Sequence, residues 1–427
     1  MTAVATPAPT RSRLGPSFFK LWSAGTVSAL GTGLATVATP LLVSQRTHNA
    51  FVVALAFFAG TVPWLLFGLP AGVIADRVDR RRLMIWVDLV RLGVLAVLGA
   101  TILTGHTSLP LLYIVLFLDG AGEVALRSAW SAMVPAVVQR DQLERANGWI
   151  MGGATLARDM ISGPLGALLF TVAASLPFLA NATSYAASAL FVALIPGTFR
   201  AHDPVPRQID ATDAADATAQ PQRRIRDDVI AGLRWLMRQR LLRTMAILIG
   251  LLNVTLTAAI SVLVLLAKDR LHVGSVGYGA LFTCMAIGGL IGSVIGDRLI
   301  KLVTATWTIR IGLIVEAALH PILATSTNAW LVGVGFLAFG VHGALWTIAS
   351  NSLRQRLTPN EVMGRVSSAY LFVAAGGNCI GALLGGALAS AYGLTAPYWV
   401  GFVAAVVVSL TTWRVFNRAA VAAAYAG

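Results

Sequence analysis

The chain has 427 residues, of which 57% are hydrophobic and 12% are charged, and its mean hydropathy is +0.76. Soluble domains carry roughly 25% charged residues, so this composition excludes an ordinary soluble protein and is typical of a protein with many membrane spans. The formal net charge of +14 would indicate nucleic-acid binding in a soluble protein. In a membrane protein, basic loops on the cytoplasmic side explain such a charge, and no nucleic-acid partner is expected.

Apolar runs that are long enough to cross a bilayer follow one another along the chain, with a polar stretch in the middle. They predict an all-α membrane protein with twelve transmembrane helices in two six-helix bundles. The expected domains are a first bundle over 1–199, a cytoplasmic linker over 200–241 and a second bundle over 242–427. The runs cover residues 21–43, 51–75, 83–104, 109–133, 149–172, 176–196, 242–267, 276–301, 307–325, 329–350, 366–390 and 394–413.

The central linker divides into two parts. Residues 200–222 hold few apolar side chains that could be buried, so they are expected to be flexible. From residue 227 to 242 the apolar residues fall on one face, which predicts an amphipathic helix on the inner leaflet. A plain connector and a regulatory element are both compatible with that pattern.

Two short stretches about 221 residues apart are nearly the same: Gly-Val-Ile-Ala-Asp-Arg at 72–77 and Ser-Val-Ile-Gly-Asp-Arg at 293–298. Asp297 and Arg298 thus echo Asp76 and Arg77. Each stretch ends an apolar run and opens a basic loop. Such internal repeats are a common plan for secondary transporters, so the two bundles are predicted to be copies of one module.

Basic residues gather in alternate loops, and by the positive-inside rule these loops are cytoplasmic. Both termini and the linker are therefore expected on the cytoplasmic side of the cell membrane. The loops in question carry Arg77, Arg80, Arg81 and Arg82, then Arg140 and Arg145, then Arg298 and Lys301, then Arg354, Arg356 and Arg365.

The loop after the second run resembles a signature of the major facilitator superfamily. That signature has a glycine, three further residues, Asp-Arg, one residue, a second glycine and then a basic pair; here Gly72, Asp76, Arg77, Arg80 and Arg81 match it. Asp79 replaces the second glycine, and its side chain is expected to tighten the turn. By this substitution the chain resembles the branch of the superfamily that holds enterobactin-type siderophore exporters and macrolide efflux pumps. The resemblance implies that the loop is a cytoplasmic gate.

The fifth run carries a second similarity, to the antiporter motif of the same superfamily, in Gly163, Pro164 and Gly166. The closing glycine of that motif is Ala167 in this chain. A proline removes a backbone hydrogen bond, and a glycine lets a neighbouring helix approach closely. Helix 5 is therefore expected to bend there and to pack against a helix of the other half.

Ionisable residues inside apolar runs are costly in a membrane and mark functional sites by default. The fourth run carries Asp119, Glu123 and Arg127 at steps of four, on one helical face. The fifth run carries Arg158 and Asp159 at similar depth. Asp119, Asp159, Arg158 and Glu123 are thus candidates for proton coupling. Two other readings stay open: a structural ion pair of Glu123 with Arg127, or, by resemblance, a gate pair of Glu123 with Arg80.

The remaining buried charges favour structural interpretations. Asp88 and Arg91 lie one turn apart and are read as a local ion pair. Glu316 and His320 lie on the ninth helix, which the resemblance makes peripheral. His342 lies on the tenth helix, which the resemblance places at the cavity, so it is either a cavity contact or a core histidine.

The leading hypothesis is a secondary active transporter: a proton-coupled exporter of small amphipathic molecules such as drugs, antibiotics or siderophores. The partners would be substrate, protons and lipid, with a monomeric chain. Alternatives are a lysophospholipid or metabolite transporter, a uniporter, or a membrane-embedded enzyme. No Walker motif, catalytic His-Glu-x-x-His motif or metal-spaced histidine cluster is found in the sequence, so no enzyme activity, metal or cofactor is expected.

Overall fold

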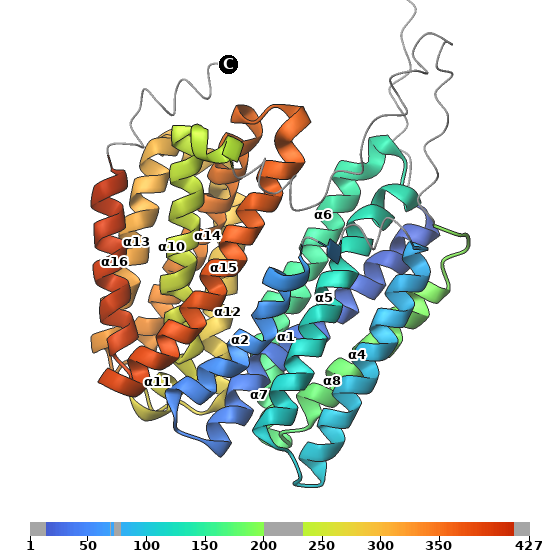
Figure 1. Ribbon diagram of the computed structural model, residues 1–427, viewed down its shortest axis with the longest axis horizontal. Coiled ribbons are helices and arrows are strands. Elements are labelled where there is room, and N and C mark those ends of the chain that lie inside the picture. Colours follow the sequence, from blue (N-terminus) through green and yellow to red (C-terminus); the bar gives the residue numbers. More distant parts are fainter. Residues whose placement is uncertain (1–13, 69, 72–77, 200–233, 414–427) are drawn as a thin grey trace, which may run out of the picture.

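The computed structural model describes residues 14–68, 70–71, 78–199 and 234–413 (Figure 1). Within these ranges every regular element is a helix. In a bilayer a helix satisfies its own backbone N–H and C=O groups, and a run of apolar residues lets its outer surface face lipid. The expected all-α membrane fold is therefore confirmed.

The first half begins with two long helices joined by a short turn at Asn49. The Asn49 side chain accepts hydrogen bonds from the N–H groups of Phe51 and Val52 and so starts the second helix. The helices of this half are α1 (Pro16–Arg46), α2 (Ala50–Phe67), α4 (Arg80–Leu103), α5 (Leu109–Val137), α6 (Leu143–Ala154), the π-helical segment η2 (Thr155–Ile161), α7 (Ser162–Val172) and α8 (Leu176–Ala193), with the 3₁₀ turn η1 (Arg140–Gln142) before α6.

The second half follows the same plan after the linker. Asn328 caps its fifth helix by accepting from the N–H of Trp330. Its helices are α10 (Arg240–Ser261), α11 (Leu263–Asp269), α12 (Ser275–Val303), α13 (Ala305–Thr325), α14 (Ala329–Leu357), α15 (Asn360–Tyr392) and α16 (Ala396–Thr412).

Ten of the described helices are long and apolar enough to cross a membrane. Two further predicted runs correspond to α16, which is shorter, and to α6, η2 and α7, which divide one run into three consecutive segments. The seventh run is also divided, at Val262, between α10 and α11. These observations are consistent with the expected twelve helices.

The two halves lie side by side and touch through few helices (Figure 1). α2 packs against α15, and α7 packs against α12. Near the end of α1 the Lys268 ammonium donates to the Ser44 carbonyl at 3.4 Å, and the Phe51 N–H donates to the Ser390 hydroxyl at 2.9 Å. These contacts lie at the end of the molecule opposite the start of α4 with Arg80 and Arg81, so the halves are joined at that far end.

The proposed domain boundaries at 199 and 242 stay predictions, since residues 200–233 lie outside the described part. The end of the predicted amphipathic helix is described: residues 234–238 are helical, with Leu236 fully buried. Leu236 packs in a cluster with Leu242 and Met245 of α10. This end of the linker is therefore anchored to the second half by apolar burial.

Candidate functional site

A network of buried charges lies inside the first half, and Arg91 of α4 is its centre. Its side chain is 1% exposed. The Nε atom lies 2.9 Å from Asp119 Oδ1, and one terminal nitrogen lies 2.8 Å from Glu123 Oε2. Both acids are on α5, one helical turn apart. One guanidinium group thus binds two carboxylates of the neighbouring helix, as its planar fork allows.

Tyr185 of α8 forms the floor of this network. Its ring lies under the Arg91 guanidinium, 4.1 Å from the ring centre to Cζ, and its hydroxyl donates to Asp119 Oδ1 at 3.1 Å. The same hydroxyl shares a hydrogen bond of 3.1 Å with the hydroxyl of Thr32 on α1. The site therefore draws on four helices, of which α1 and α8 contribute neutral hydroxyls.

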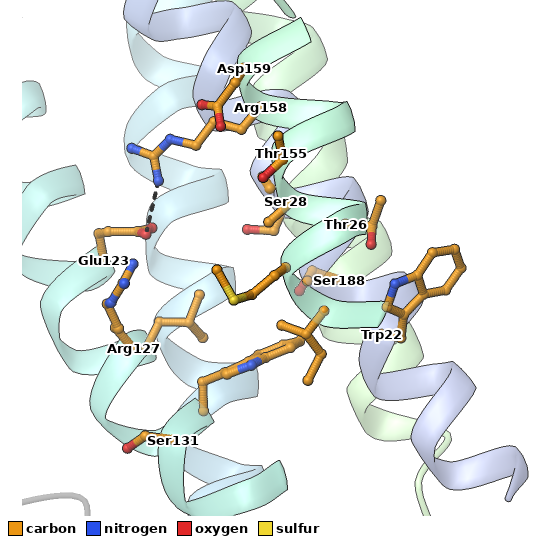
Figure 2. A pocket seen from close by; sticks show the side chains of 17 residues that line it. Trp22, Thr26, Ser28, Glu123, Arg127, Ser131, Thr155, Arg158, Asp159 and Ser188 are labelled. Atoms are coloured by element: carbon orange, nitrogen blue, oxygen red, sulfur yellow. Dashed lines mark ion pairs between the residues drawn. The ribbon is translucent and has the colours of Figure 1, made fainter. Parts of the chain in front are cut away.

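Two cavities meet at this network. The first has a volume of about 480 Å³ and lies among α1, α5, α6 and η2; Figure 2 shows its lining, including Trp22, Thr26, Arg127, Arg158 and Asp159. The second has a volume of about 230 Å³ and lies deeper, among α1, α2 and α5. Pockets that bind small molecules commonly measure about 300–1,000 Å³, so the first cavity suffices for a small organic ligand.

Glu123 and Arg158 line both cavities. The Arg158 guanidinium lies 3.9 Å from Glu123 Oε1, which is longer than a direct hydrogen bond, and the Arg158 side chain is 42% exposed. Figure 2 shows this contact crossing the cavity. Glu123 is held firmly by Arg91 on one side and loosely by Arg158 on the other. Arg158 is therefore the partner that is free to move.

The π-helical segment η2 brings Arg158 and Asp159 to the cavity. The N–H of Ser162 bonds to the carbonyl of Ala157, five residues back, in place of the usual four. Pro164 lies just beyond the segment, has no N–H, and so cannot close the α-helical bond to the turn before it. Proline and π-turns are recognised causes of irregular helices. The π-helical segment ends two residues before Gly163, and the bend expected at the Gly163-Pro164 pair stays a prediction.

The glycines of helix 5 lie where two helices come close. A Cβ on Gly163 would stand 2.9 Å from the backbone oxygen of Gly279 on α12, and one on Gly166 would stand 3.0 Å from the Leu34 carbonyl of α1. Gly163 therefore lets the first half contact the second, as expected. Gly166 serves packing within the first half.

The gate motif is described only in part. Gly72, Asp76 and Arg77 lie outside the described residues, so their role stays a prediction. The Arg81 guanidinium donates to the carbonyls of Val192, Ala193 and Gly197 at the end of α8. It satisfies carbonyls that a helix end leaves free. In this structure Arg81 ties α4 to α8 within one half.

Asp79 adds to the same junction. Its carboxylate accepts from the N–H of Arg82 at 3.0 Å, which caps α4, and from the N–H of Phe199 at 3.1 Å. Burial opposes ionisation of this carboxyl, but these backbone hydrogen bonds outweigh it and lower the pKa of Asp79 from its usual 3.8. The departure from the glycine of the family signature thus has a structural use as a helix cap.

Several expected pairings are different in the structure. Arg91 bonds to Asp119 and Glu123 rather than forming a local pair with Asp88. Asp88 is buried beside the Ser188 hydroxyl. Arg127 lies over the ring of Trp64 at 5.7 Å rather than bridging to Glu123. The reason is that spacing within one helix does not show which side chains a neighbouring helix supplies.

His342, expected at the cavity, is buried between α13 and α14 and lines neither cavity described above. Its Nε2 lies 3.9 Å from Glu316 Oε2, and its ring packs over Gly312. Glu316 is buried as well, and its structural interpretation stays a prediction. Asp297 and Arg298 of the second half repeat Asp76 and Arg77. Arg298 is exposed, and the side chain of Asp297 lies outside the described residues.

Sequence reasoning missed Tyr185 and Thr32, and it misread Arg91. The position of Arg91 in the middle of an apolar run was a usable signal, because an unpaired guanidinium is not stable at that depth. In the described residues, no group of three or more His, Cys, Asp or Glu side chains could hold a metal ion. The chemistry that this arrangement shows is charge pairing, with one buried guanidinium group bound to two carboxylates.

Residues 5–424 match the family model described as transmembrane secretion effector, a branch of the major facilitator superfamily. The chain belongs to this family. It is therefore a membrane transporter, as the loop motif predicted, and the family is one of transporters rather than a class of enzymes.

Relatives within this family include the enterobactin exporter EntS of Escherichia coli O1:K1, which is 26% identical over 379 residues, covering 87% of this chain and 85% of the relative. EntS of Citrobacter koseri is also 26% identical over the same shares.

Solved structures share the fold. A mutant form of the nucleoside transporter NupG has a TM-score of 0.74 at 10% identity and covers 94% of this chain and 100% of its own. A bacterial homologue of the iron transporter ferroportin, in its inward-facing state, has a TM-score of 0.71 at 17% identity and covers 95% and 100%.

Proposed function

We propose that this transporter exports small amphipathic organic molecules, such as a siderophore, drug or antibiotic, in exchange for protons. The observation that carries the proposal is the junction of the two cavities. A cavity of ligand size adjoins a charged cluster in which Asp119 and Glu123 share one arginine. The named relatives that export enterobactin support the direction of transport and the class of substrate.

The first cavity suits an amphipathic ligand. Trp22, Trp130 and Ile150 offer apolar surface, while Arg127 and Arg158 offer guanidinium donors. A neutral hydrogen-bond acceptor of the substrate would pair with Arg158, whose contact with Glu123 is long. Large apolar walls with few polar groups are what such sites commonly use.

Proton exchange would follow from the same contact. While Arg158 and Arg91 both face Glu123, the carboxylates of the cluster are stabilised in the ionised form, because nearby cations favour it. A hydrogen-bond donor of the substrate that reaches Glu123 would favour the ionised form in the same way and would displace a bound proton. Substrate binding and protonation of the acids would then exclude each other, which is the coupling that antiport requires.

Alternating access would come from rocking of the halves. The halves are joined near Ser44, Phe51, Lys268 and Ser390, and the first cavity lies toward the opposite, arginine-rich end. If basic loops face the cytoplasm, this state would take up substrate from the inside. Both termini would then also be cytoplasmic.

The test compares Asp119→Asn and Asp159→Asn in inverted membrane vesicles, with labelled enterobactin and a labelled macrolide as the compounds assayed. Two rates are measured for each: uptake driven by a pH gradient, and counterflow down the compound's own gradient. We expect Asp119→Asn to lose pH-driven uptake at least tenfold and to keep counterflow, because exchange moves no net proton.

Asp159 separates two mechanisms. If Asp159 carries the proton, Asp159→Asn gives the same pattern as Asp119→Asn. If it only accompanies Arg158, whose side chain is 42% exposed and also faces Glu123, Asp159→Asn keeps both pH-driven uptake and counterflow. Retention of pH-driven uptake by both variants would refute proton coupling at this cluster and leave a uniporter as the reading to pursue.

A further inference from the structure

Tyr185 lies at the one place where the acid cluster is joined to α1 by side-chain hydrogen bonds among the described contacts. Its side chain is fully buried on α8. Its hydroxyl donates to Asp119 Oδ1 and shares a bond with the Thr32 hydroxyl, each at 3.1 Å. The Arg91 guanidinium above the ring fixes the position of the phenol. A tyrosine hydroxyl can both donate and accept a hydrogen bond, so Tyr185 can donate either to Asp119 or to Thr32.

Thr32 differs from the other threonines that line the second cavity. The hydroxyls of Thr36, Thr39 and Thr61 each donate to a backbone carbonyl four residues back in their own helix. The hydroxyl of Thr32 instead bonds to Tyr185 of another helix. Thr32 is therefore the hydroxyl of this cavity wall that connects α1 to α8 and, through Tyr185, to Asp119.

We propose that Tyr185 is a positioning residue for the proton site, whose hydroxyl donates to Asp119 when this acid is ionised and turns to Thr32 when it is protonated. This inference rests on the proposed function, because it assigns a second residue to the same coupling step. It adds a link between the charge of Asp119 and α1, which lines both cavities.

The step involves one proton only. Asp119 lines the second cavity, and both described bonds to it end on Oδ1. A proton from the cavity binds to Oδ2, and Oδ1 becomes the weaker acceptor of a neutral carboxyl group. The Tyr185 O–H then rotates to donate to Thr32 Oγ1, with its own proton never leaving the phenol. Release of the proton reverses both changes.

The charged groups near Asp119 come from α4, from α5 itself and from η2. Arg91 and Asp88 come from α4, Glu123 from α5 itself, and Arg158 from η2 across the second cavity. Arg91 is bonded to both acids at once, and Glu123 is held by two arginines. Tyr185 is the neutral donor in this set.

The test is an infrared titration of the intact protein in lipid bilayers, which follows the carbonyl band of protonated carboxyl groups as the pH is changed. Asp119→Asn identifies the band by removing it. Tyr185→Phe deletes the hydroxyl and keeps the ring under Arg91. Loss of a donor to the ionised carboxylate should move the titration midpoint of that band up by about one to two pH units.

Tyr398→Phe is the matched control. Tyr398 is also fully buried, on the last helix of the other half, and its hydroxyl donates to the backbone carbonyl of Ala259 at 3.2 Å. Its loss should leave the Asp119 midpoint unchanged. An unshifted midpoint in Tyr185→Phe, or an equal shift in Tyr398→Phe, would overturn the proposal.

If Tyr185→Phe does not fold, a second variant with its own control tests the same proposal. Thr32→Val removes the bond that polarises the Tyr185 hydroxyl and should shift the midpoint in the same direction by a smaller amount. Its control is Thr255→Val on α10, whose buried hydroxyl donates to the Leu252 carbonyl. A Thr32→Val midpoint equal to that of the wild type would count against the link to α1.

These results are separable from the proposed function. If Asp119→Asn removes no titrating band, the proton site itself is wrong. If the band is present but insensitive to Tyr185, proton coupling at Asp119 stands and only the role of the tyrosine is wrong.

Discussion

The two halves of the molecule are built to one plan but differ in what they do with the corresponding arginine. The repeat aligns Arg91-Leu-Gly with Arg310-Ile-Gly. Arg91 is buried in the first half and binds two acids of α5. Arg310 lies beside the touching rings of Trp307 and Trp413 and donates to the Trp413 carbonyl at the end of α16 at 2.9 Å. The first arginine serves a charged site, whereas the second closes a helix end.

The acids show the same division. The N-caps Ser108 and Asn328 align α5 with α14, and α14 then carries Phe339 in place of Asp119. The adjacent glycines, Gly120 and Gly340, each lie against the backbone of the neighbouring helix, α2 or α12, so the two halves pack alike there and differ in the charged side chain. The buried acid of the second half, Glu316, is paired with His342 away from both cavities. A duplicated scaffold can therefore hold transport chemistry in one copy and rigid support in the other.

The largest effect is expected from removing the two arginines. Arg91→Met leaves two acids at mid-membrane with one loosely placed cation, and breaking a buried pair costs about 3–5 kcal/mol. Arg310→Met removes a hydrogen bond and stacking with two rings, and about 1 kcal/mol is expected. Thermal unfolding in detergent would measure both. Equal losses would show that the two arginines have the same role.

Substituting one buried acid in each half compares what the two halves contribute to transport. Glu123→Gln should reduce pH-driven uptake in vesicles several-fold, because Glu123 joins Arg91 to Arg158. Glu316→Gln keeps the shape of the side chain and lies away from the cavities, so pH-driven uptake should stay within about twofold of wild type, a change of about 0.4 kcal/mol. A larger loss in Glu316→Gln would place coupling chemistry in the second half as well.

The contact between the halves depends on backbone approach at Gly163 and Gly279. Gly279→Val would drive its side chain into the Gly163 carbonyl and Ala167, and overpacking of this kind costs about 1–3 kcal/mol. Gly343→Ala is the control, because a Cβ there meets open space. Cysteine cross-linking between α7 and α12 would report the separation. Unchanged cross-linking in Gly279→Val would contradict the close approach.

The smallest effect concerns the cap at Asp79. Asp79→Ala should lower stability by about 0.5–2 kcal/mol at neutral pH, the range for loss of an N-cap. Since the pKa of Asp79 is lowered in the folded state, its stabilisation is fully present above the unfolded value near 3.8 and is lost as the pH falls through the folded value. The difference between wild type and variant should therefore shrink below about pH 3.8 in acid unfolding curves. A difference that stays constant with pH would mean that charge plays no part in the cap.

Much of the fold could be predicted from the sequence, because apolar runs of bilayer length leave few alternatives to helices. The interruptions within these helices could not be predicted in the same way. The run over 149–172 looks continuous, yet it contains the π-turns before Pro164, and the run over 242–267 breaks at Val262. Such breaks depend on how a helix packs against its neighbours.

For the site, the sequence identified the acids and missed their partners. Asp119 and Glu123 stood out as charges in an apolar helix. Their bonds go to Arg91, 28 and 32 residues away on another helix, and to Tyr185 on a third. A single sequence shows which residues share a helical face, but the rotation of each helix against the others is a property of packing.

The far end, where the halves meet, is held by few hydrogen bonds. The Lys268 ammonium reaches a carbonyl at 3.4 Å, and Phe51 and Ser390 share one hydrogen bond. Each such bond contributes about 1 kcal/mol net, which is close to the free energy of moving one proton across one pH unit, about 1.4 kcal/mol. Separating the halves at this end therefore breaks bonds of modest strength and parts the surfaces of α2 and α15.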